Sequence, residues 1–347
     1  MCRENDHNQK ILRLLLSNDD TNIELGFQLC LGLQGHYNKE VQQALQKFPV
    51  LCLRHGLETT FTHKLNCLYL LTKNSVEEVG LFSEPVAQYH HEKGLPAEIW
   101  QFKNLQKLIL DDNQLKTLPN EITQLNRLHM LSLMYNPDLD LKDTFGKIKH
   151  MNSLKVLHLS DIEFTNLPIE VAQLIHLKEL HIILSQNLDI RDALRKISRL
   201  SPLQELSFYS SNILHLSPEL TQMKHLKVLT VADNSLESFP EEILELDQLK
   251  QLNLTVNQLS SLPPHITRLK SLERLHLDGN QLEQLPETLG QLKNLKELTL
   301  SYNFLESLPP SIAQLKNLRR LDLTHNKALK IDSNKVHHWL PECEIIW

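Results

Sequence analysis

Histidine is the side chain with the widest chemical repertoire in this chain, and three histidines recur at one place in a repeated pattern. His158, His181 and His276 each stand four residues after the first leucine of a repeat. His158 and His181 come from consecutive repeats, so we expect them to face each other on adjacent strands. Two imidazoles can begin a zinc site or make a surface pH-sensitive, but no third ligand has zinc-like spacing. We therefore expect exposed surface histidines and no metal or other cofactor.

The motifs that would support catalysis are missing from the sequence. There is no G-x-x-x-x-G-K-[ST] loop, no G-x-G-x-x-G after a strand, no H-E-x-x-H and no G-x-S-x-G. The run His90-His91-Glu92 lacks a second histidine at the required offset. The cysteines are odd in number, widely spaced and typical of free thiols in a reducing compartment. They are Cys2, Cys30, Cys52, Cys67 and Cys343. The sequence thus predicts a protein that is not an enzyme.

The repeat itself reads Leu-x-x-Leu-x-Leu-x-x-Asn-x-Leu-x-x-Leu-Pro and occurs ten times. Successive repeats are 23 residues apart, except after Leu128 and Leu177, where the step is 26. The leucines at period 2 indicate a short strand with one buried face, and equivalent strands stack in parallel about 4.8 Å apart. A period of this length predicts a solenoid. The repeats begin at Leu105, Leu128, Leu154, Leu177, Leu203, Leu226, Leu249, Leu272, Leu295 and Leu318.

Two polar features accompany the leucines. An asparagine follows most strands, and a buried asparagine has the donors and the acceptor to satisfy the backbone of a turn. A proline then fixes φ and removes a donor on the outer side. We expect the leucines and asparagines to serve packing only. The asparagines are Asn113, Asn136, Asn234, Asn257, Asn280, Asn303 and Asn326, and the prolines are Pro119, Pro168, Pro240, Pro263, Pro286 and Pro309.

This pattern resembles the leucine-rich repeat family, in the subgroup with a Leu-Pro step, over about residues 95 to 347. The subgroup includes intracellular Ras-pathway scaffolds and many bacterial proteins of no known activity. The resemblance implies an α/β solenoid, a leucine-rich-repeat horseshoe with a parallel sheet on its concave face. Ahead of it the sequence predicts a small all-α N-terminal domain. The resemblance also implies a broad binding surface, without naming the partner.

The predicted organisation has three parts. Residues 1–84 form a helical N-terminal domain or cap, 85–335 form the repeats, and 336–347 form a C-terminal cap. The first repeat is degenerate, since Leu95-Pro96 and Ile99 match only the second half of the pattern. Residues 6–17 are expected to form a first helix. Capping signals predict further helices from Thr21 with Glu24 to Gly35, from Asn38 to Phe48, from Thr59 or Thr60 to about Lys73, and after Ser75 with Glu78. The C-terminal cap would use Val336, Trp339, Leu340, Pro341, Ile345 and Trp347.

The repeats from Leu128 to Leu203 depart from the pattern. The two long repeats contain helix-like stretches, Phe145 to Met151 and Leu194 to Leu200, and the end of the last repeat, at Leu329 and Ile331, resembles them. Three consecutive repeats replace the asparagine, with Ile162, Ser185 and Ser211.

Outward strand positions of the same region are unusually apolar, which is typical of interaction sites. Asp161, Glu179 and Glu205 would add to a polar rim. The alternatives are that Ile183 and Leu184 turn inward, or that the patch is ordinary surface. Tyr302 and His325 suggest a weaker second patch. The predicted protein-binding residues are Met130, Met134, Tyr135, Val156, His158, His181, Ile183, Leu184 and Tyr209.

Charge and hydropathy limit the classes of partner that the sequence favours. The net charge is −6 and the pI is about 6.3, so no basic excess favours nucleic acid. No apolar stretch approaches the roughly 20 residues of a membrane span, and no secretory signal begins the sequence, so we expect a cytoplasmic protein. No small-molecule substrate is indicated. The sequence favours a protein-binding scaffold. The alternative is a recognition arm that docks through its helical N-terminal domain onto a separate catalytic complex, of a signalling or ubiquitin-ligase-like kind.

Overall fold

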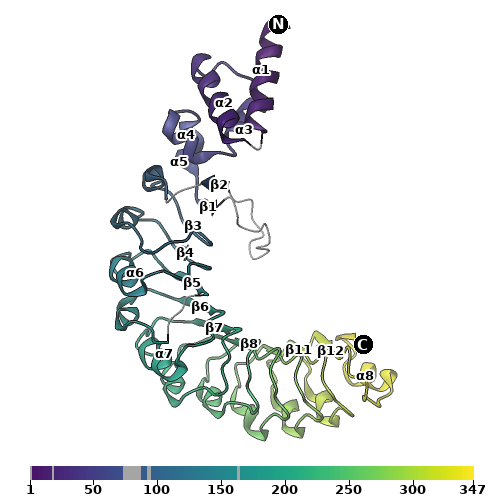
Figure 1. The fold of residues 1–347 in the computed structure, drawn as a ribbon. Helices are drawn as coiled ribbons and strands as arrows, with labels where there is room; N and C mark the ends of the chain where they lie inside the picture. Colours follow the sequence, from purple (N-terminus) through teal and green to yellow (C-terminus); the bar gives the residue numbers. More distant parts are fainter. Residues whose placement is uncertain (1, 18, 73–86, 92–94, 162–164) are drawn as a thin grey trace. The chain divides into compact units, whose positions relative to one another are not determined.

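The fold is an α/β solenoid with a helical N-terminal segment, as the sequence predicts. The computed structural model describes residues 2–17, 19–72, 87–91, 95–161 and 165–347. It divides into two compact units, Met1–Leu154 and Lys155–Trp347. In each unit, parallel strands line one side of the repeats and helical turns line the other (Figure 1).

The described part of the first unit begins with five helices. They are α1 (Cys2–Leu15), α2 (Asp20–Gly32), α3 (Lys39–Leu45), α4 (Pro49–His55) and α5 (Thr59–Lys64). Their apolar faces enclose a separate small core in which Phe27, Cys30 and Leu45 are fully buried. α4 was not predicted, although Pro49 at its first turn is a common helix start.

Three of the predicted helix starts can be compared with the structure. The predicted cap at Thr59 or Thr60 is wrong, because α5 begins at Thr59 after Glu58 and has no side-chain cap. Asn38 caps α3, because its side chain accepts a hydrogen bond from the Val41 amide at 2.9 Å. The predicted start at Thr21 is wrong, since Asp19 caps α2 by accepting from the Thr21 amide at 2.8 Å. An aspartate two residues earlier competes for the same free amides. The predicted cap at Ser75 and Glu78 lies outside the described residues.

The predicted helix from Thr59 to Lys73 is also wrong in its second half. The α5 helix ends at Lys64, and Cys67–Thr72 is strand β1, which pairs in parallel with β3 (Lys107–Ile109). Leu65, Leu68 and Leu70 are buried and carry the Leu-x-x-Leu-x-Leu spacing. The Asn113 amide donates to the Leu70 carbonyl at 2.9 Å, as later asparagines do to the preceding repeat. A repeat strand therefore lies 40 residues ahead of the first complete repeat.

The sheet of the first unit has the order β2-β1-β3-β4. Strand β2 (Ala87–His91) pairs with β1 on the side away from β3, and β4 (Met130–Ser132) follows β3. The predicted degenerate repeat contributes a 3₁₀ helix, η1 (Ala97–Gln101), which begins directly after Pro96 and buries Ile99. The predicted domain boundary at residue 84 falls outside the described residues.

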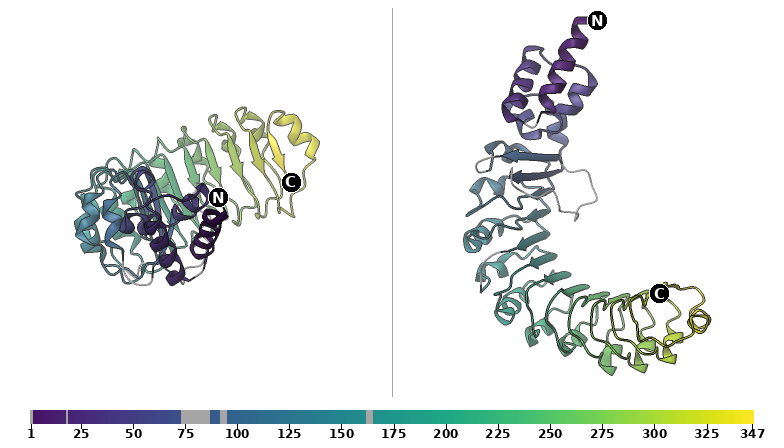
Figure 2. Two further views of the ribbon diagram at one scale, coloured as in Figure 1. Left: turned by 90° about the horizontal axis from the view of Figure 1, so that it is seen from above. Right: turned by 45° about the vertical axis from the view of Figure 1, so that its right-hand side comes forward.

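The described residues of the second unit form nine parallel strands in chain order, each paired with the next; Figure 2 shows them side by side. Pairing places leucine beside leucine, as in Leu252, Leu275 and Leu298, so the buried faces merge into one core. The strands are β5 (Val156–Ser160), β6 (Glu179–Ile183), β7 (Glu205–Tyr209), β8 (Val228–Ala232), β9 (Gln251–Asn253), β10 (Arg274–His276), β11 (Glu297–Thr299), β12 (Arg320–Asp322) and β13 (Glu344–Ile346).

The outer side of the repeats is built from short helices. Most start directly after the repeat proline, whose fixed φ suits a helix start. The two long repeats instead form α6 (Leu141–Ile148) and α7 (Ile190–Ile197), which confirms the predicted helix-like stretches. The 3₁₀ helices are η2 (Asn120–Gln124), η3 (Ile169–Gln173), η4 (Pro218–Gln222), η5 (Glu241–Glu245), η6 (Pro264–Arg268), η7 (Glu287–Gln291) and η8 (Pro310–Gln314).

The C-terminal end of the second unit repeats this design. Asp332 caps α8 (Ser333–Trp339), whose Val336 is fully buried, and Leu340 follows with 3% exposure. β13 then pairs with β12, an addition that the sequence did not predict. Trp347 remains 46% exposed, so it contributes little to the core.

The asparagines form a buried ladder that joins one repeat to the next. The Asn280 oxygen accepts from the Leu259 amide at 3.0 Å, and its amide group donates to the carbonyls of Leu254 at 2.9 Å and Leu277 at 3.0 Å. Where serine replaces asparagine, the Ser211 hydroxyl donates to Tyr209 and lies 3.4 Å from the Ser185 amide. The shorter side chain thus makes fewer and longer bonds. Ile162 lies outside the described residues.

The packing of the leucine core can be tested at Leu277, which is completely buried. We predict that Leu277→Ala lowers the free energy of unfolding by about 2–5 kcal/mol, because it leaves a cavity between neighbouring repeats. Urea denaturation followed by circular dichroism measures the change. The exposed Gln281 in the same repeat is the control, since Gln281→Ala should change stability by less than about 0.5 kcal/mol. Equal effects of the two variants would contradict the assignment of Leu277 to the core.

Candidate functional site

The predicted binding residues of the first unit are mostly inaccessible. Met130 and Met134 are only 8% and 1% exposed, which corrects the expectation that they present an apolar surface. The repeat pattern specifies the direction of a side chain, but not whether other groups cover it. Tyr135 is 39% exposed and lies just before the asparagine with φ of 57°.

The second unit gathers its predicted residues on one side of three strands. Ser160, Ile183 and Tyr209 are partners in register across β5, β6 and β7. Ile183 is half-buried and Tyr209 is 43% exposed, whereas Ile182, directly before Ile183, is fully buried. The possibility that Ile183 turns inward is therefore excluded. We call this surface the β5–β7 face, formed by Val156, His158, His181, Ile183, Leu184 and Tyr209.

His158 and His181 lie side by side on this face, in register and with ring centroids 4.5 Å apart. Both rings are largely buried, which corrects the expectation of exposed histidines. Burial lowers the pKa of His158 to about 3, with a contribution from His181, and burial lowers the pKa of His181 to about 4. The His158 Nδ1 atom is buried and has no hydrogen-bond partner among the described residues. The two imidazoles are consequently neutral at pH 7.

The carboxylates beside the histidines do not convert them into a metal site. Glu205 Oε1 lies 3.9 Å from His181 Nε2, and burial followed by the charge of Glu179 raises the pKa of Glu205. Within the described part of the chain, no group of three or more His, Cys, Asp or Glu side chains is arranged to hold a metal ion.

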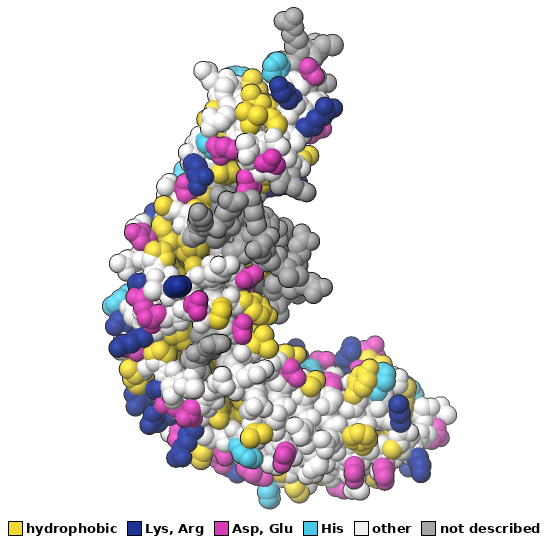
Figure 3. Space-filling model, viewed as in Figure 1, with side chains coloured by type: hydrophobic (Ala, Val, Ile, Leu, Met, Phe, Trp, Pro, Cys, Tyr) yellow, Lys and Arg dark blue, Asp and Glu magenta, His cyan; other side chains and the backbone are white. Residues whose placement is uncertain are grey.

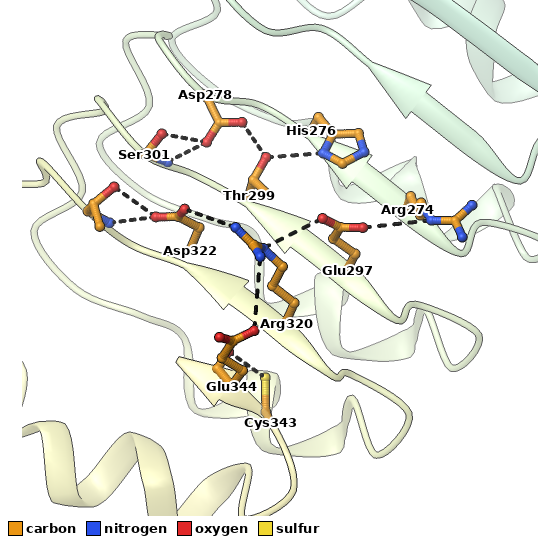
Figure 4. Close-up of polar contacts among 11 residues, drawn as sticks. Arg274, His276, Asp278, Glu297, Thr299, Ser301, Arg320, Asp322, Cys343 and Glu344 are labelled. Carbon is orange, nitrogen blue, oxygen red and sulfur yellow. Dashed lines mark hydrogen bonds and ion pairs between the residues drawn. The ribbon is translucent and has the colours of Figure 1, made fainter. Parts of the chain in front are cut away.

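The C-terminal strands carry a different surface, in which charges pair with each other. Figure 4 shows Arg320 between Glu297, Asp322 and Glu344, at 3.7, 4.0 and 4.0 Å. Glu297 also lies 3.7 Å from Arg274. On the face seen in Figure 3, acidic and basic side chains are interspersed over the C-terminal repeats. Little unbalanced charge is left on these strands for a phosphate or a nucleic acid.

A further group of residues lies where each strand ends. We call the residue directly before the repeat asparagine, or its replacement, the turn residue. All turn residues have φ between 49° and 64°, a left-handed conformation that is costly for side chains other than Gly, Asn or Asp. They are Asp112, Tyr135, Asp161, Leu184, Ser210, Asp233, Val256, Gly279, Tyr302 and His325.

The predicted second patch belongs to this group. The rings of Tyr302 and His325 stack at a centroid distance of 4.0 Å and an angle of 7°. Tyr302 is 61% exposed, and sequence reasoning missed its exposed neighbours Val256 and Phe304, at 50% and 60%. The available signal was an apolar residue at the turn position, or directly after the asparagine, where other repeats are mostly polar.

A buried carboxylate also escaped prediction. Asp111 is 1% exposed, and its Oδ1 accepts from the Ser132 hydroxyl at 2.6 Å and from the Met134 amide at 2.9 Å. Burial raises its pKa to about 6 in spite of these bonds. Asp278 makes equivalent bonds with Thr299 and Ser301, so the arrangement ties one strand end to the next in both units.

Comparison with known proteins identifies related sequences and folds. Models of the leucine rich repeat family match residues 104–125, 224–282 and 270–327. No curated protein matches the chain. No helix in the described residues has the length and apolar character needed to cross a lipid bilayer.

Solved structures that are similar to this chain include the following three. An internalin (inlF) from Listeria monocytogenes is 21% identical, with 75% of this chain and 71% of that chain covered and a TM-score of 0.57. TLR13, in a structure of the TLR13–ssRNA13 complex, is 23% identical over 70% of this chain and 36% of its own, with a TM-score of 0.53. An LRR protein of Leptospira interrogans is 30% identical over 73% of this chain and 86% of its own, with a TM-score of 0.32.

The histidine pair predicts an acid-sensitive fold. Both folded pKa values lie below the ordinary value of 6.5, so the unfolded chain binds more protons between pH 6.5 and about 4. The contribution of the neutral histidines to the free energy of unfolding should be fully present above pH 6.5. The free energy of unfolding should fall by about 1–2 kcal/mol per histidine as the pH drops to 5. Urea denaturation at pH 7 and pH 5 measures this loss.

The matched variant for this test is His158→Gln, which removes one of the two titrating groups. Its loss between pH 7 and pH 5 should be clearly smaller than that of the unsubstituted protein. An identical loss in both proteins would show that the pair does not control the acid response.

Proposed function

We propose that this chain, which belongs to the leucine-rich repeat family, is a non-catalytic scaffold that binds a protein through the β5–β7 face. The observation that carries the proposal is that Ile183 and Tyr209 are partners in register on the outward side of the neighbouring strands β6 and β7. Outward strand side chains contribute little to the core, so an apolar group there is best explained by a partner.

The composition of the face supports a protein partner. Tyrosine is enriched at the centres of protein interfaces, and Tyr209 is well exposed. The neutral His158 and His181 add little charge to desolvate on binding. A nucleic acid is less suited to this chain, whose net charge is −6. The ssRNA in the TLR13 structure is a ligand of that protein, and it is not carried over to this chain.

Absence of catalysis and a cytoplasmic location remain part of the proposal. Cys30, Cys52 and Cys343 are buried free thiols whose pKa values burial raises to about 11, 12 and 11. Such thiols are poor nucleophiles at pH 7 and suit a reducing compartment. We also infer membership of the subgroup with the Leu-Pro step, from the prolines that precede the 3₁₀ helices.

A second proposal is that the N-terminal helices dock onto a separate catalytic complex. The observation in its favour is the exposure of three leucines at the end of α1 and on α2. Leu16, Leu25 and Leu31 are 58%, 48% and 37% exposed. Exposed leucines on short helices suit a partner that covers them.

The principal proposal is tested by Tyr209→Ala. We expect this variant to bind the captured partner at least about tenfold more weakly, because the most exposed aromatic side chain of the face is removed. Its free energy of unfolding should change by less than about 0.5 kcal/mol. The experiment combines affinity capture from the native source, mass spectrometry and titration of the recovered partner.

Ile175→Ala is the matched control, since Ile175 is 58% exposed but lies in the turn before the repeat leucine, outside the β5–β7 face. It should leave binding unchanged. Equal binding by Tyr209→Ala and the unsubstituted protein would refute this face as the binding site.

The docking proposal is tested by the double variant Leu16→Glu and Leu25→Glu. If the helices dock, this variant loses one captured complex, because charge prevents burial of the two positions, and keeps the partner that depends on Tyr209. Circular dichroism should show unchanged helix content. Recovery of every partner at the normal level would rule out docking through these leucines.

A further inference from the structure

Basic side chains gather along the edge of the second unit at which strands β8 to β12 begin. Five segments that end directly before these strands contain nine lysines and arginines but three acidic residues. The other residues between 228 and 332 contain four basic and eleven acidic residues. Eight of those acidic residues lie in the turns after the strands or at the first two positions of the 3₁₀ helices, so charge is separated across each repeat. We call the five segments the strand-entry row, which comprises residues 222–227, 245–250, 268–273, 291–296 and 314–319.

Backbone hydrogen bonds hold the segments of the row side by side. The Lys250 amide donates to the Lys227 carbonyl at 2.8 Å. The same bond, at 2.7 to 2.8 Å, joins each later pair of segments, from Glu273 to Lys250, from Lys296 to Glu273 and from Arg319 to Lys296. Equivalent residues therefore lie about one strand spacing, 4.8 Å, apart. The five segments extend over about 19 Å, which is the length of an extended peptide of about six residues.

The two glutamates of the row are each shared between bases of the flanking segments. Both glutamates are half-buried, and each has a base within 3.6 Å on either side. Hydrogen bonds from one of these bases lower the pKa of each glutamate, so both are charged at pH 7. One negative charge thus faces two positive charges at each place. Glu245 lies between Lys224 and Arg268, and Glu273 lies between Lys250 and Lys296.

Three exposed lysines of the row have no carboxylate beside them. Lys270, Lys293 and Lys316 hold the same position in consecutive segments, and none of them makes an ion pair with the described residues. The Lys293 amino group donates to neutral oxygens, those of Gly290 at 2.7 Å and Gln314 at 3.1 Å. These ammonium groups are therefore available to an external anion.

Acidic residues at the borders of the row do not cancel its charge. Asp247 holds the position of Lys270 one segment earlier, and Glu342, just beyond the last segment, lies 3.4 Å from Arg319. With Glu342 included, basic residues still outnumber acidic ones by five. The charged strand residues directly after the segments are balanced and lie 3.7 to 4.0 Å from one another; they are Arg274, Glu297, Arg320 and Glu344.

We propose that the strand-entry row binds an acidic segment of a protein partner in extended form, with its carboxylates beside Lys270, Lys293 and Lys316. Four exposed glutamines between the bases supply amide donors for the carbonyl groups of such a segment. The row is a second contact that rests on the proposed protein-binding role. It lies on repeats that follow those of the β5–β7 face.

The composition of the row favours a protein segment over other polyanions. The five segments contain no phenylalanine, tyrosine or tryptophan on which a nucleic-acid base could stack. Their leucines and Met223 are buried, so no large apolar side chain is available to enter a lipid bilayer. Charge pairing with carboxylates, supported by amide donors, is what the exposed side chains offer.

The test uses the purified full chain and a synthetic peptide, so it does not depend on the native partner. The probe is rhodamine-labelled Gly-Glu-Ser-Glu-Ser-Glu-Ser-Glu-Gly-amide, and fluorescence anisotropy measures its binding. We expect saturable binding that weakens as salt is raised from 50 to 300 mM. The analogue with glutamine in place of each glutamate keeps the shape without the charge, and it should bind at least about tenfold more weakly.

Variants with the same change in net charge test the location. Lys270→Glu with Lys316→Glu reverses two charges of the row and should weaken peptide binding at least about tenfold. Lys327→Glu with Lys330→Glu is the matched control, because these exposed lysines lie after strand β12, at the other end of the strand. It should change the affinity by less than about threefold, and circular dichroism should be the same for both variants.

Four outcomes would overturn the proposal. They are no binding of the acidic peptide, equal binding of the glutamine analogue, equal losses in the two double variants, and tighter binding to a thymidine oligonucleotide with four phosphates or to phosphatidylserine vesicles. The last result would assign the row to a nucleic acid or a membrane. The proposal for the β5–β7 face is judged separately, through Tyr209 and the captured partner.

Discussion

The structure depends on satisfying buried backbone groups where each strand turns outward. Leucines alone would bury the strand ends together with free amides and carbonyls, which is costly. The asparagine ladder removes that cost, as Asn303 does by donating to the carbonyls of Leu277 and Leu300 at 2.9 and 3.1 Å. Because each asparagine bonds to the preceding repeat, the ladder also fixes the register between strands.

That fixed register creates two surfaces with different chemistry. Outward strand positions are freed from packing, so they can carry an apolar group in one region and paired charges in another. Turn residues are held in a left-handed conformation by the same bonds, and their side chains project where the strands end. The repeats that replace asparagine with serine are those of β6 and β7, which bear most of the β5–β7 face. Weaker support of the turn and the altered surface therefore occur together.

Much of the fold follows from the sequence, because leucine spacing, asparagine and proline each have a physical role that repeats. Strand β1 could also have been recognised, since Leu65, Leu68 and Leu70 carry the repeat spacing; the long separation from Leu105 concealed it. Burial of Met130 and Met134 could not be deduced, because the pattern gives direction but not coverage. The neutral state of His158 and His181 likewise depends on burial that only coordinates reveal. The stack of Tyr302 on His325 required the left-handed turn geometry.

The central claim is that the outward side of β5–β7 is where a partner binds. Hydroxyl-radical footprinting of the protein with and without its captured partner tests this most directly, because it reports side-chain accessibility in the unaltered chain. We expect reduced modification of Tyr209 and Ile183 in the complex and unchanged modification of Ile175 on the turn before the repeat leucine. Protection of Ile175 with full reactivity of Tyr209 would contradict the account.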